Sequence, residues 1–524
     1  MNIIGQSFLG LNRTATNGTT DTFQVTNPTT GETLEPTFHA ATSEELNTAV
    51  TLAEEAFLPY SQITPSERAT FLRTIAEKID ALGEEITPRM MAETGLPEPR
   101  CQGERGRTCG QLKMFADLIE EGSWVDARIE TGQPDRAPLP KPDLRSMRRP
   151  LGPVAVFCAS NFPLAFSVAG GDTASALAAG CPVIVRAHAA HAGTAELVAS
   201  AIQDAVKTCG LPEGTFSMIF DAGIALGTEL VTHPLIKAVG FTGSRKGGRS
   251  LMDAAAARPE PIPVFAEMSS VNPIFIMPGA MAERGAEIAQ GLVTSVTMGA
   301  GQFCTCPGLV FAAPSEEFEK TLQGSISETA PITMLHAGIH NNYTCGLDEL
   351  KTQSKVSTIE QITSENTGCK AGPAILKAPA SEFINNPALS AEVFGPSSLL
   401  IECSSGQDML SAAAQLEGQL TATVHGTEQD LQRASGLLQL LEQKAGRLII
   451  NSFPTGVEVC SSMVHGGPYP ATSDGASTSV GTGSILRYTR PVSYQGFPDC
   501  SLPPELQEAN PQGISRLVNG KLSH

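Results

Sequence analysis

A regular alternation of strand-like and helix-like segments between residues 154 and 241 restricts the possible folds more than any other feature of this sequence. Short apolar runs predict strands at residues 154–157, 183–185, 216–220 and 238–241. Longer segments that end at a glycine predict helices at residues 166–179 and 194–209. Strands that alternate with helices form a parallel sheet with right-handed crossovers. The sequence therefore predicts an α/β fold with a Rossmann-like parallel sheet.

Candidate binding residues follow these strands. Parallel sheets bind ligands beyond the carboxyl ends of their strands, where the loops with Asn161, Arg186 and Gly243 are expected. The dinucleotide motif G-x-G-x-x-G does not occur. Instead, the glycine-rich turn at residues 243–248 opens a helix, whose free N–H groups and positive dipole end favour a phosphate. Taken alone, the turn fits a plain helix start at least as well.

Length and charge narrow the class of protein. A chain of 524 residues predicts two or three domains, and 41% hydrophobic with 17% charged residues is typical of a globular protein. A net charge of −19 argues against nucleic acid or an anionic membrane as the partner, because both attract a basic surface.

No signal peptide and no membrane span are expected. The N-terminus lacks a basic segment followed by an apolar one. Residues 150–171 carry no charge, but prolines and a glycine pair interrupt them, which favours a strand, loop and helix over a span. Twelve cysteines without paired C-x-x-C motifs fit a reducing cytoplasm.

One cysteine stands in a setting that suits a nucleophile. Cys304 lies in the stretch Gly-Gln-Phe-Cys-Thr-Cys-Pro-Gly, residues 301–308, which predicts a constrained loop. A free thiol has a pKa of about 8.5, and its thiolate fraction is strongly nucleophilic. The alternative is an inert, buried small side chain, the usual fate of a free cysteine. Cys306 lies close by, but no His or Cys follows at zinc spacing, so no metal site is predicted.

The remaining segments are scaffold. Residues 1–40 predict edge strands and turns, and capping boxes at Thr42 and Thr64 predict helix starts. The proline- and arginine-rich segment 126–150 reads as an arm, either an oligomer contact or a solvated linker. Helices are expected near 282–297 and 406–416 and a strand at 447–450, whereas the tail 485–524 reads as irregular.

Five motifs, which follow one another in a fixed order along the chain, indicate a resemblance to a known protein family. They are Ser-Asn-Phe-Pro at Asn161, the Gly243-Ser244 turn, Phe-Ala-Glu-Met-Ser-Ser at Glu267, Gly-Gln-Phe-Cys-Thr at Cys304 and Glu-Val-Phe-Gly-Pro at Glu392. In this order, from about residue 20 to 495, the chain resembles the aldehyde dehydrogenase superfamily. Residues 159–182 and 454–459, with His-Gly-Gly-Pro at 465–468, are most similar to the branch of α-ketoglutaric semialdehyde and bacterial NADP-dependent fatty aldehyde dehydrogenases.

The resemblance implies roles for three residues. Cys304 would add to an aldehyde, and the amide of Asn161 with the Cys304 backbone N–H would hold the oxyanion. After hydride transfer to the cofactor leaves a thioester, Glu267 would be the general base for the water that hydrolyses it. Relatives that pass the acyl group to coenzyme A generally lack this carboxylate, so a free acid is the expected product.

The resemblance also implies a nicotinamide cofactor. Gly243 and Ser244 form the phosphate turn, and Glu392 and Phe394 match contacts to the nicotinamide ribose. Arg186 takes the place of the lysine that holds the adenosine ribose, and position 189 has alanine in place of the acid typical of NAD users. Arg186 with His188 favours NADP. NAD remains the alternative, since Ile224 offers no second cation.

The implied architecture has three parts: an NAD(P)-binding domain at 1–133 and 153–267, a catalytic domain at 268–470, and a small β oligomerisation arm and tail at 134–152 and 483–524. A homodimer or homotetramer is expected. The favoured substrate is α-ketoglutaric semialdehyde (2,5-dioxopentanoate), oxidised to 2-oxoglutarate; the alternative is a long-chain or broad-range aliphatic aldehyde. The residues considered for the substrate are Phe162, Phe166 and Ala169 for an apolar tunnel, and Arg105 or Arg107 for a carboxylate anchor.

The chain departs from the family pattern at two places, and two other functions remain as alternatives. Met268-Ser269-Ser270 replaces the usual Leu-Gly-Gly after the catalytic glutamate, and Cys306 is either a bystander or an oxidative trap for Cys304. A cysteine hydrolase or thioesterase would use Cys304 without a nicotinamide. A non-catalytic relative would bind cofactor without turnover.

Overall fold

The computed structural model describes residues 3–14, 21–221, 223–364 and 368–523. Its first sheet has seven strands in the order β11-β10-β7-β8-β9-β1-β2, parallel from β11 to β9. The strands are β7 (Val154–Phe157), β8 (Val183–Arg186), β9 (Phe216–Ile219), β10 (Ala238–Thr242), β11 (Val264–Glu267) and the antiparallel edge strands β1 (Phe8–Leu9) and β2 (Asn12–Arg13). The predicted parallel sheet is confirmed.

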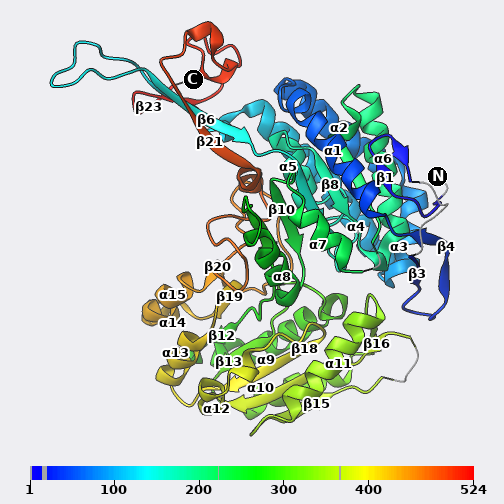
Figure 1. The fold of residues 1–524 in the computed structure, drawn as a ribbon. Coiled ribbons are helices and arrows are strands. Elements are labelled where there is room, and N and C mark those ends of the chain that lie inside the picture. The colour runs from blue at the N-terminus through cyan, green and yellow to red at the C-terminus, as the bar shows by residue number, and fades with distance from the viewer. Residues whose placement is uncertain (1–2, 15–20, 222, 365–367, 524) are drawn as a thin grey trace.

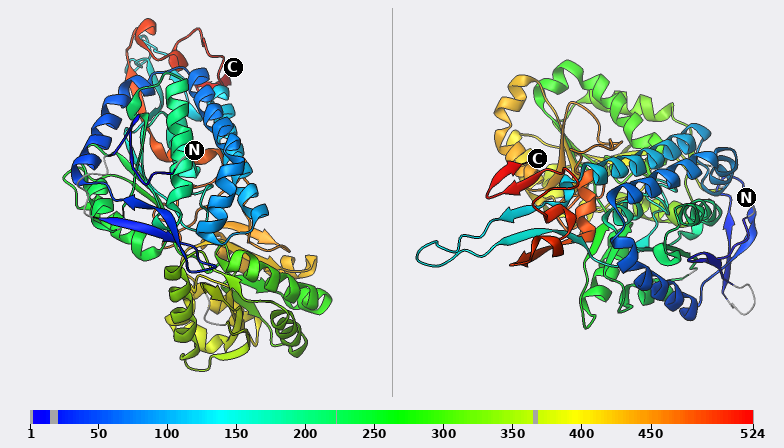
Figure 2. Two further views of the ribbon diagram at one scale, coloured as in Figure 1. Left: turned by 90° about the vertical axis from the view of Figure 1, so that its right-hand side faces the viewer. Right: turned by 90° about the horizontal axis from the view of Figure 1, so that it is seen from above.

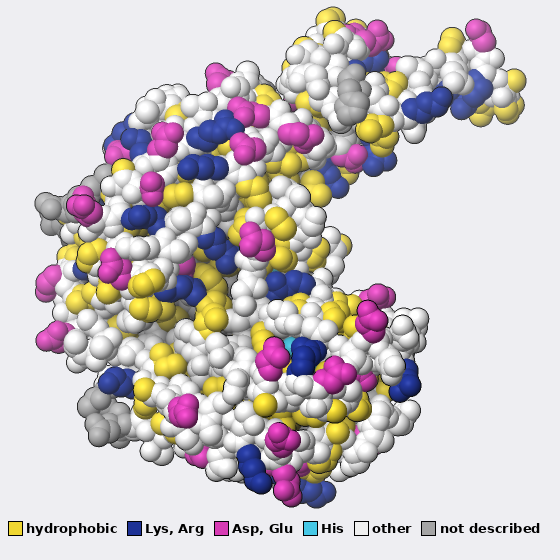
Figure 3. All heavy atoms as spheres, turned by 180° about the vertical axis from the view of Figure 1, so that it is seen from behind, with side chains coloured by type: hydrophobic (Ala, Val, Ile, Leu, Met, Phe, Trp, Pro, Cys, Tyr) yellow, Lys and Arg dark blue, Asp and Glu magenta, His cyan; other side chains and the backbone are white. Residues whose placement is uncertain are grey.

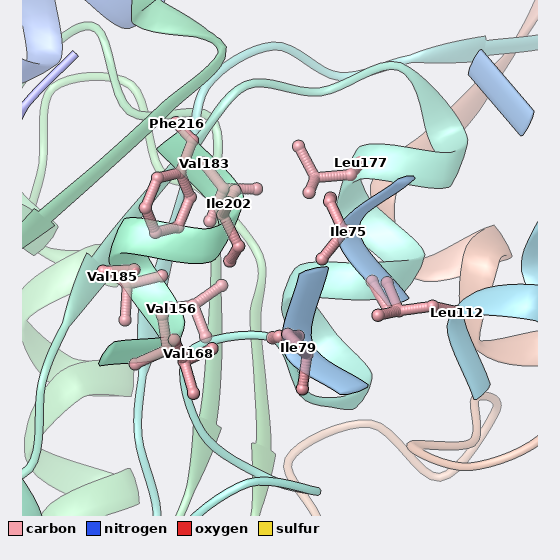
Figure 4. Close-up of a cluster of buried hydrophobic side chains, with 14 of the residues drawn as sticks. Ile75, Ile79, Leu112, Val156, Val168, Leu177, Val183, Val185, Ile202 and Phe216 are labelled. Atoms are coloured by element: carbon pink, nitrogen blue, oxygen red, sulfur yellow. The ribbon is translucent and has the colours of Figure 1, made fainter. Parts of the chain in front are cut away.

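Helices cover both faces of this sheet (Figure 1). They are α1 (Ser43–Ser61), α2 (Pro65–Ala81), α3 (Gly83–Thr94), α4 (Glu98–Glu121), α5 (Gly171–Ala179), α6 (Ala192–Thr208), α7 (Ala225–Thr232) and α8 (Arg245–Ala256). Alternate strand residues enter two different cores. Val156 packs with side chains of α2, α5 and α6 (Figure 4), and Val154 belongs to the same core. Ala155 packs with α1 and α7 on the other face. Both predicted capping boxes, at Thr42 and Thr64, are present.

One helix begins later than predicted. The segment expected to be helical from residue 166 becomes α5 only at Gly171. The residues before it form turns, because the carboxylate of Glu104 on α4 accepts hydrogen bonds from the backbone N–H groups of Leu164 (3.2 Å) and Ala165 (3.4 Å). A helix start set by a partner 60 residues away has no local signature.

The second sheet also has seven strands, in the order β15-β17-β18-β13-β12-β19-β20, all parallel except β15. They are β12 (Ile274–Ile276), β13 (Leu309–Ala312), β15 (Ser357–Gln361), β17 (Ala374–Pro379), β18 (Ser397–Glu402), β19 (Gln419–His425) and β20 (Ala445–Ile450). Its helices are α9 (Pro278–Thr297), α10 (Glu316–Ser327), α11 (Ala337–Lys351), α12 (Ala380–Asn385), α13 (Gly406–Gln415), α14 (Glu428–Arg433) and α15 (Ser435–Glu442). In Figure 1 this sheet forms the lower lobe.

A five-stranded sheet, β21-β6-β5-β22-β23, forms the base of a projecting arm (Figures 1 and 2). Its strands are β5 (Arg128–Glu130), β6 (Leu144–Pro150), β21 (Thr489–Gln495), β22 (Arg516–Val518) and β23 (Lys521–Ser523). The prediction of an irregular tail is therefore wrong for residues 489–495, 516–518 and 521–523, which form strands. Strand β21 pairs with β6 along its whole length, and its proline is tolerated because β21 is an edge strand.

Two small two-stranded antiparallel sheets complete the fold: β3 (Thr22–Thr26) with β4 (Thr33–His39), and β14 (Ile332–Thr333) with β16 (Lys370–Ala371). On the face shown in Figure 3, acidic and basic side chains are interspersed, and the arm projects from the body. Among the described residues, no helix is both long enough and apolar enough to cross a membrane.

Candidate functional site

The loop that carries Cys304 has a constrained backbone. It follows a 3₁₀ turn, Met298–Gly301, in which Gly299, Ala300 and Gly301 all have positive φ angles, of 56°, 57° and 65°. A Cβ atom at Gly301 would lie 2.2 Å from the carbonyl oxygen of Gly395, so only glycine fits there. The predicted constrained loop is thus present, and neighbouring backbone holds it tightly.

A buried amide also holds this loop. Asn272 Nδ2 donates to the carbonyl oxygens of Cys304 (2.8 Å) and Cys306 (2.9 Å). The hydroxyl of Ser270 lies 2.9 Å from both Asn272 Oδ1 and Gln419 Oε1. Ser270 belongs to the Met-Ser-Ser departure, so its hydroxyl links that segment to the Cys304 loop. The sequence predicted no role for Asn272 or Gln419, because their contacts span distant parts of the chain.

The thiol of Cys304 faces a histidine and a carboxylate. Its Sγ lies 3.3 Å from Nε2 of His465, and the same Nε2 lies 2.9 Å from Oε1 of Glu267. Ser479 Oγ donates to the other oxygen of Glu267 at 2.6 Å. His465 Nδ1 is buried without a partner among the described residues, which places a ring proton on Nε2, facing Glu267. The sequence singled out His465 only as part of a motif.

Burial and neighbouring groups shift the pKa values of the two acids in opposite directions. Burial raises the pKa of Glu267, but the charge and hydrogen bond of His465 and the hydroxyl of Ser479 outweigh it and lower that pKa to about 2. The pKa of the Cys304 thiol lies well above its ordinary value, first because the thiol is buried and then because the Glu267 carboxylate is adjacent. The charge of Arg107 opposes this rise. The resting thiol is therefore protonated beside an ionised carboxylate.

Asn161 contacts the same loop. It follows β7, and its Nδ2 donates to the carbonyl oxygen of Gln302 at 3.1 Å. A side-chain amide nitrogen carries two hydrogens, so one remains for another acceptor. The three predicted catalytic residues, Asn161, Glu267 and Cys304, thus converge although more than 140 positions separate Asn161 from the Cys304 loop.

A cavity of about 420 Å³ extends from Cys304 along the carboxyl ends of the first sheet. Its wall includes all the predicted cofactor residues, namely Arg186, His188, Gly243, Ser244, Glu392 and Phe394. The side chain of Ser244 caps α8, and a Cβ atom at Gly243 would lie 2.7 Å from the ring of Phe241. A helix start kept open by glycine fits a phosphate group, so these residues suit a dinucleotide.

The far end of this cavity differs from the expectation. Arg186 Nε donates to Oδ2 of Asp221 at 2.9 Å, and its Nη2 donates to the carbonyl oxygen of Gly223 at 2.6 Å. Burial, followed by the charges of His191 and His336, holds the pKa of His188 well below its usual value, so His188 is neutral near pH 7. Arg186, which the sequence offered together with His188 as an attraction for a 2′-phosphate, is thus ion-paired with Asp221, and His188 adds no positive charge there.

Aromatic side chains pack beside the Cys304 loop. Phe162 contacts Phe166 and Phe303 edge-on, with ring centroids 5.2 and 5.5 Å apart. Ala169, which the sequence placed in this lining, instead belongs to the main core of the first sheet. Cys306 is half-buried, and burial followed by the charge of Glu392 raises its pKa to about 12.

The candidate residues also form a possible metal-ligand set. Within the described ranges, one group of three suitable side chains occurs: Glu267, Cys304 and His465, whose ligand atoms lie within 4.8 Å of one another. Sequence spacing could not reveal this group, because its members come from three separate segments.

Known proteins resemble the chain over nearly its full length. The model of the aldehyde dehydrogenase family matches residues 15–468. Alpha-ketoglutaric semialdehyde dehydrogenase 2 of Azospirillum brasilense is 49% identical, over 99% of this chain and 100% of that protein. Alpha-ketoglutaric semialdehyde dehydrogenase of Acinetobacter baylyi is 47% identical, over 99% of both chains.

Solved structures share the fold at lower identity. An aldehyde dehydrogenase of Pseudomonas syringae, solved with NAD+ and octanal, superposes with a TM-score of 0.80 at 20% identity, covering 95% of this chain and 98% of its own. An NADP-dependent enzyme of Escherichia coli gives 0.79 at 22% identity, covering 94% and 98%. By its sequence and its fold, this chain belongs to the aldehyde dehydrogenase family, whose members oxidise aldehydes with NAD(P).

Proposed function

We propose that this enzyme oxidises α-ketoglutaric semialdehyde to 2-oxoglutarate through a thioester on Cys304. The observation that carries the chemistry is the contact of Cys304 with His465 and Glu267 at one end of the cavity. The substrate is supported by the two relatives at 47–49% identity, both named for this semialdehyde.

The first step is addition of the sulfur of Cys304 to the aldehyde carbon. The thiol proton passes to Glu267, which is ionised beside it, and the His465 N–H then stabilises the thiolate. The carbonyl oxygen becomes an oxyanion held by the Asn161 amide and the Cys304 backbone N–H. Loss of one such donor typically costs about 10²–10³ in rate.

The second step leaves a thioester. When bound, NAD(P)+ supplies the acceptor for the hydride that leaves the former aldehyde carbon. Glu267 releases its proton to solvent and then takes one from the water that attacks the thioester, which frees the carboxylate product and the thiol. Ser479 and His465 hold both oxygens of Glu267 in place for this step.

The coenzyme preference centres on Arg186. With alanine at position 189, no acid on that loop repels a 2′-phosphate, and on this basis NADP is the proposed coenzyme. The pairing of Arg186 with Asp221 supports NAD as the alternative, because Asp221 neutralises the cation that would hold the phosphate. In this proposal Asp221 limits the affinity of the site for NADP.

The two seven-stranded sheets would have different roles. The first sheet, with residues 1–133 and 153–267, would bind NAD(P), and the second, within residues 268–470, would carry Cys304. The arm, residues 134–152, and the tail, residues 483–524, would join subunits in a homodimer or homotetramer. Two features support this role: the arm projects from the body, and β21 exposes an unpaired edge (Figure 1).

Absorbance of NADPH and NADH tests the function. Wild type and Cys304→Ala would be compared with α-ketoglutaric semialdehyde, succinic semialdehyde and a medium-chain aliphatic aldehyde. The proposal expects the first substrate to have the highest kcat/KM and the variant to be inactive. A tenfold preference for the aliphatic aldehyde would establish the alternative, a broad-range aldehyde dehydrogenase. Ester turnover without reduced coenzyme would indicate a hydrolase.

A further inference from the structure

Two arginines of α4 lie against the aromatic cluster beside Cys304. The guanidinium of Arg100 is 4.5 Å from the ring centroid of Phe162 and 4.6 Å from that of Phe303. The guanidinium of Arg107 is 5.6 Å from Phe162 and 5.5 Å from the ring of Phe166. Seven residues separate the two arginines, so they lie on the same face of the helix.

The two arginines differ in their partners. Arg100 donates from Nε and Nη2 to Oε1 of Glu104, at 3.0 and 2.9 Å. The other carboxylate oxygen of Glu104 accepts from the backbone of the turn before α5. The charge of Arg100 is therefore paired with the carboxylate of Glu104.

Arg107 has no such compensation. Its Nε and Nη2 atoms are buried, and neither has a hydrogen-bond partner among the residues that the structure describes. Burial lowers the pKa of Arg107, and electrostatic interactions with Cys304, Glu104 and Glu267 oppose that effect. A buried, unpaired cation is costly unless an anion meets it.

Arg105, the other candidate from the sequence, lies on a different face of α4. Its Nε is 3.4 Å from Oδ1 of the exposed residue Asp80, and its guanidinium lies against Gly83. Arg105 therefore contacts α2 and α3, away from the aromatic cluster, which makes it a matched control on the same helix.

We propose that Arg107 binds the distal carboxylate of the substrate while the aldehyde carbon reacts at Cys304. This inference rests on the proposed function, since an aliphatic aldehyde would leave the guanidinium unpaired. An extended five-carbon chain spans about 5 Å from its first to its last carbon, a length suited to join a thiol to a nearby cation. The planar fork of Arg107 matches a carboxylate, and the rings of Phe162 and Phe166 exclude water from the pair.

The test compares Arg107→Met, Arg107→Lys and the control Arg105→Gln. With α-ketoglutaric semialdehyde we expect Arg107→Met to lose about 10- to 100-fold in kcat/KM, mostly through KM, because a charge-assisted hydrogen bond is lost. For pentanal, which lacks the carboxylate, kcat/KM of Arg107→Met should change less than about threefold relative to wild type. Arg107→Lys should recover part of the loss, and Arg105→Gln should match wild type on both substrates.

A binding readout separates recognition from catalysis. Glutarate, a dicarboxylate of similar length, should slow alkylation of Cys304 by iodoacetamide in wild type and in Arg105→Gln, but not in Arg107→Met. Equal losses of kcat/KM on both aldehydes would overturn the inference. They would show that Arg107 stabilises the thiolate of Cys304 or the fold instead. Full retention of the semialdehyde activity would also overturn it. If wild type itself prefers pentanal, the proposed substrate fails, whatever Arg107 does.

Discussion

The imidazole Nε2 of His465 lies 2.9 Å from Oε1 of Glu267, although 198 positions separate the two residues in the chain. Both side chains are only 1% exposed, so water does not screen the contact. The same nitrogen lies 3.3 Å from the sulfur of Cys304. One N–H group can thus stabilise the carboxylate in the resting enzyme and the thiolate during attack.

Glu267→Gln should lower the pKa of Cys304 and block turnover. The carboxylate raises the thiol pKa, so a neutral amide moves the pH midpoint of alkylation downward. Hydrolysis should fall by about 10²–10⁴ because the general base is lost. Alkylation of Cys304 against pH, read by mass spectrometry, measures the first effect. A burst of one NAD(P)H per active site, followed by little further turnover, measures the second effect, the slowed hydrolysis. An upward shift of the midpoint would contradict the assignment.

His465→Gln should slow the attack of Cys304 more than it weakens substrate binding. The variant loses the N–H that faces both Glu267 and Cys304, so the rate of the NAD(P)H burst should fall about 10- to 100-fold. Stopped-flow absorbance under single-turnover conditions measures this rate. Ser479→Ala, which removes one neutral donor to Glu267, should have a smaller effect. Because glutamine keeps an amide donor, His465→Leu is the stricter variant, and a normal burst in both variants would show that the ring only fills space.

Asp221→Asn should improve the use of NADP+. The substitution removes the carboxylate that neutralises Arg186 but keeps the shape of the side chain. We expect KM for NADP+ to fall about tenfold relative to that for NAD+, equivalent to about 1.4 kcal/mol. Steady-state kinetics with each coenzyme measure the ratio. Asp253→Asn, on the exposed face of α8, should leave it unchanged. An unchanged ratio in Asp221→Asn would remove Asp221 from coenzyme selection.

Asn272→Ala should destabilise the enzyme and misplace its nucleophile. The carbonyl oxygens of Cys304 and Cys306 would both lose a buried donor, at a cost of about 1–3 kcal/mol each. The backbone of Asn272 also has a φ of 45°, which asparagine tolerates better than alanine. Urea unfolding should give a lower midpoint, and kcat should fall in the protein that remains folded. If Asn272→Ala is as stable as wild type, the two carbonyl oxygens have other donors.

Zinc should inhibit the enzyme reversibly. Tetrahedral zinc sites hold N, O and S ligands about 3.3–3.6 Å apart, close to the 3.3 and 2.9 Å observed around His465. Binding displaces the thiol proton, so inhibition should strengthen as pH rises. Activity at increasing Zn²⁺, before and after EDTA, measures this effect. His465→Gln should weaken inhibition about tenfold or more. Inhibition of equal strength in that variant would place the metal elsewhere.

Sequence alone determined the features that depend on neighbours in the chain. The alternation of apolar runs predicted the parallel sheet, and β7 has the predicted bounds. The capping boxes at Thr42 and Thr64 form within a single helical turn and are present as predicted. The motif order brought Asn161, Glu267 and Cys304 together as candidates, because each motif is a local pattern. These features need no knowledge of packing.

Only the tertiary structure decided which side chains meet. His465 reaches Cys304 across 161 positions, and Asp221 neutralises Arg186 across 35. The difference between Arg100, which is paired, and Arg107, which is not, appears only once α4 packs on the aromatic cluster. The strength of each contact depends on distance and burial in three dimensions. Spacing along a chain fixes neither of these, so the partners of a charged group remain hidden until the fold is known.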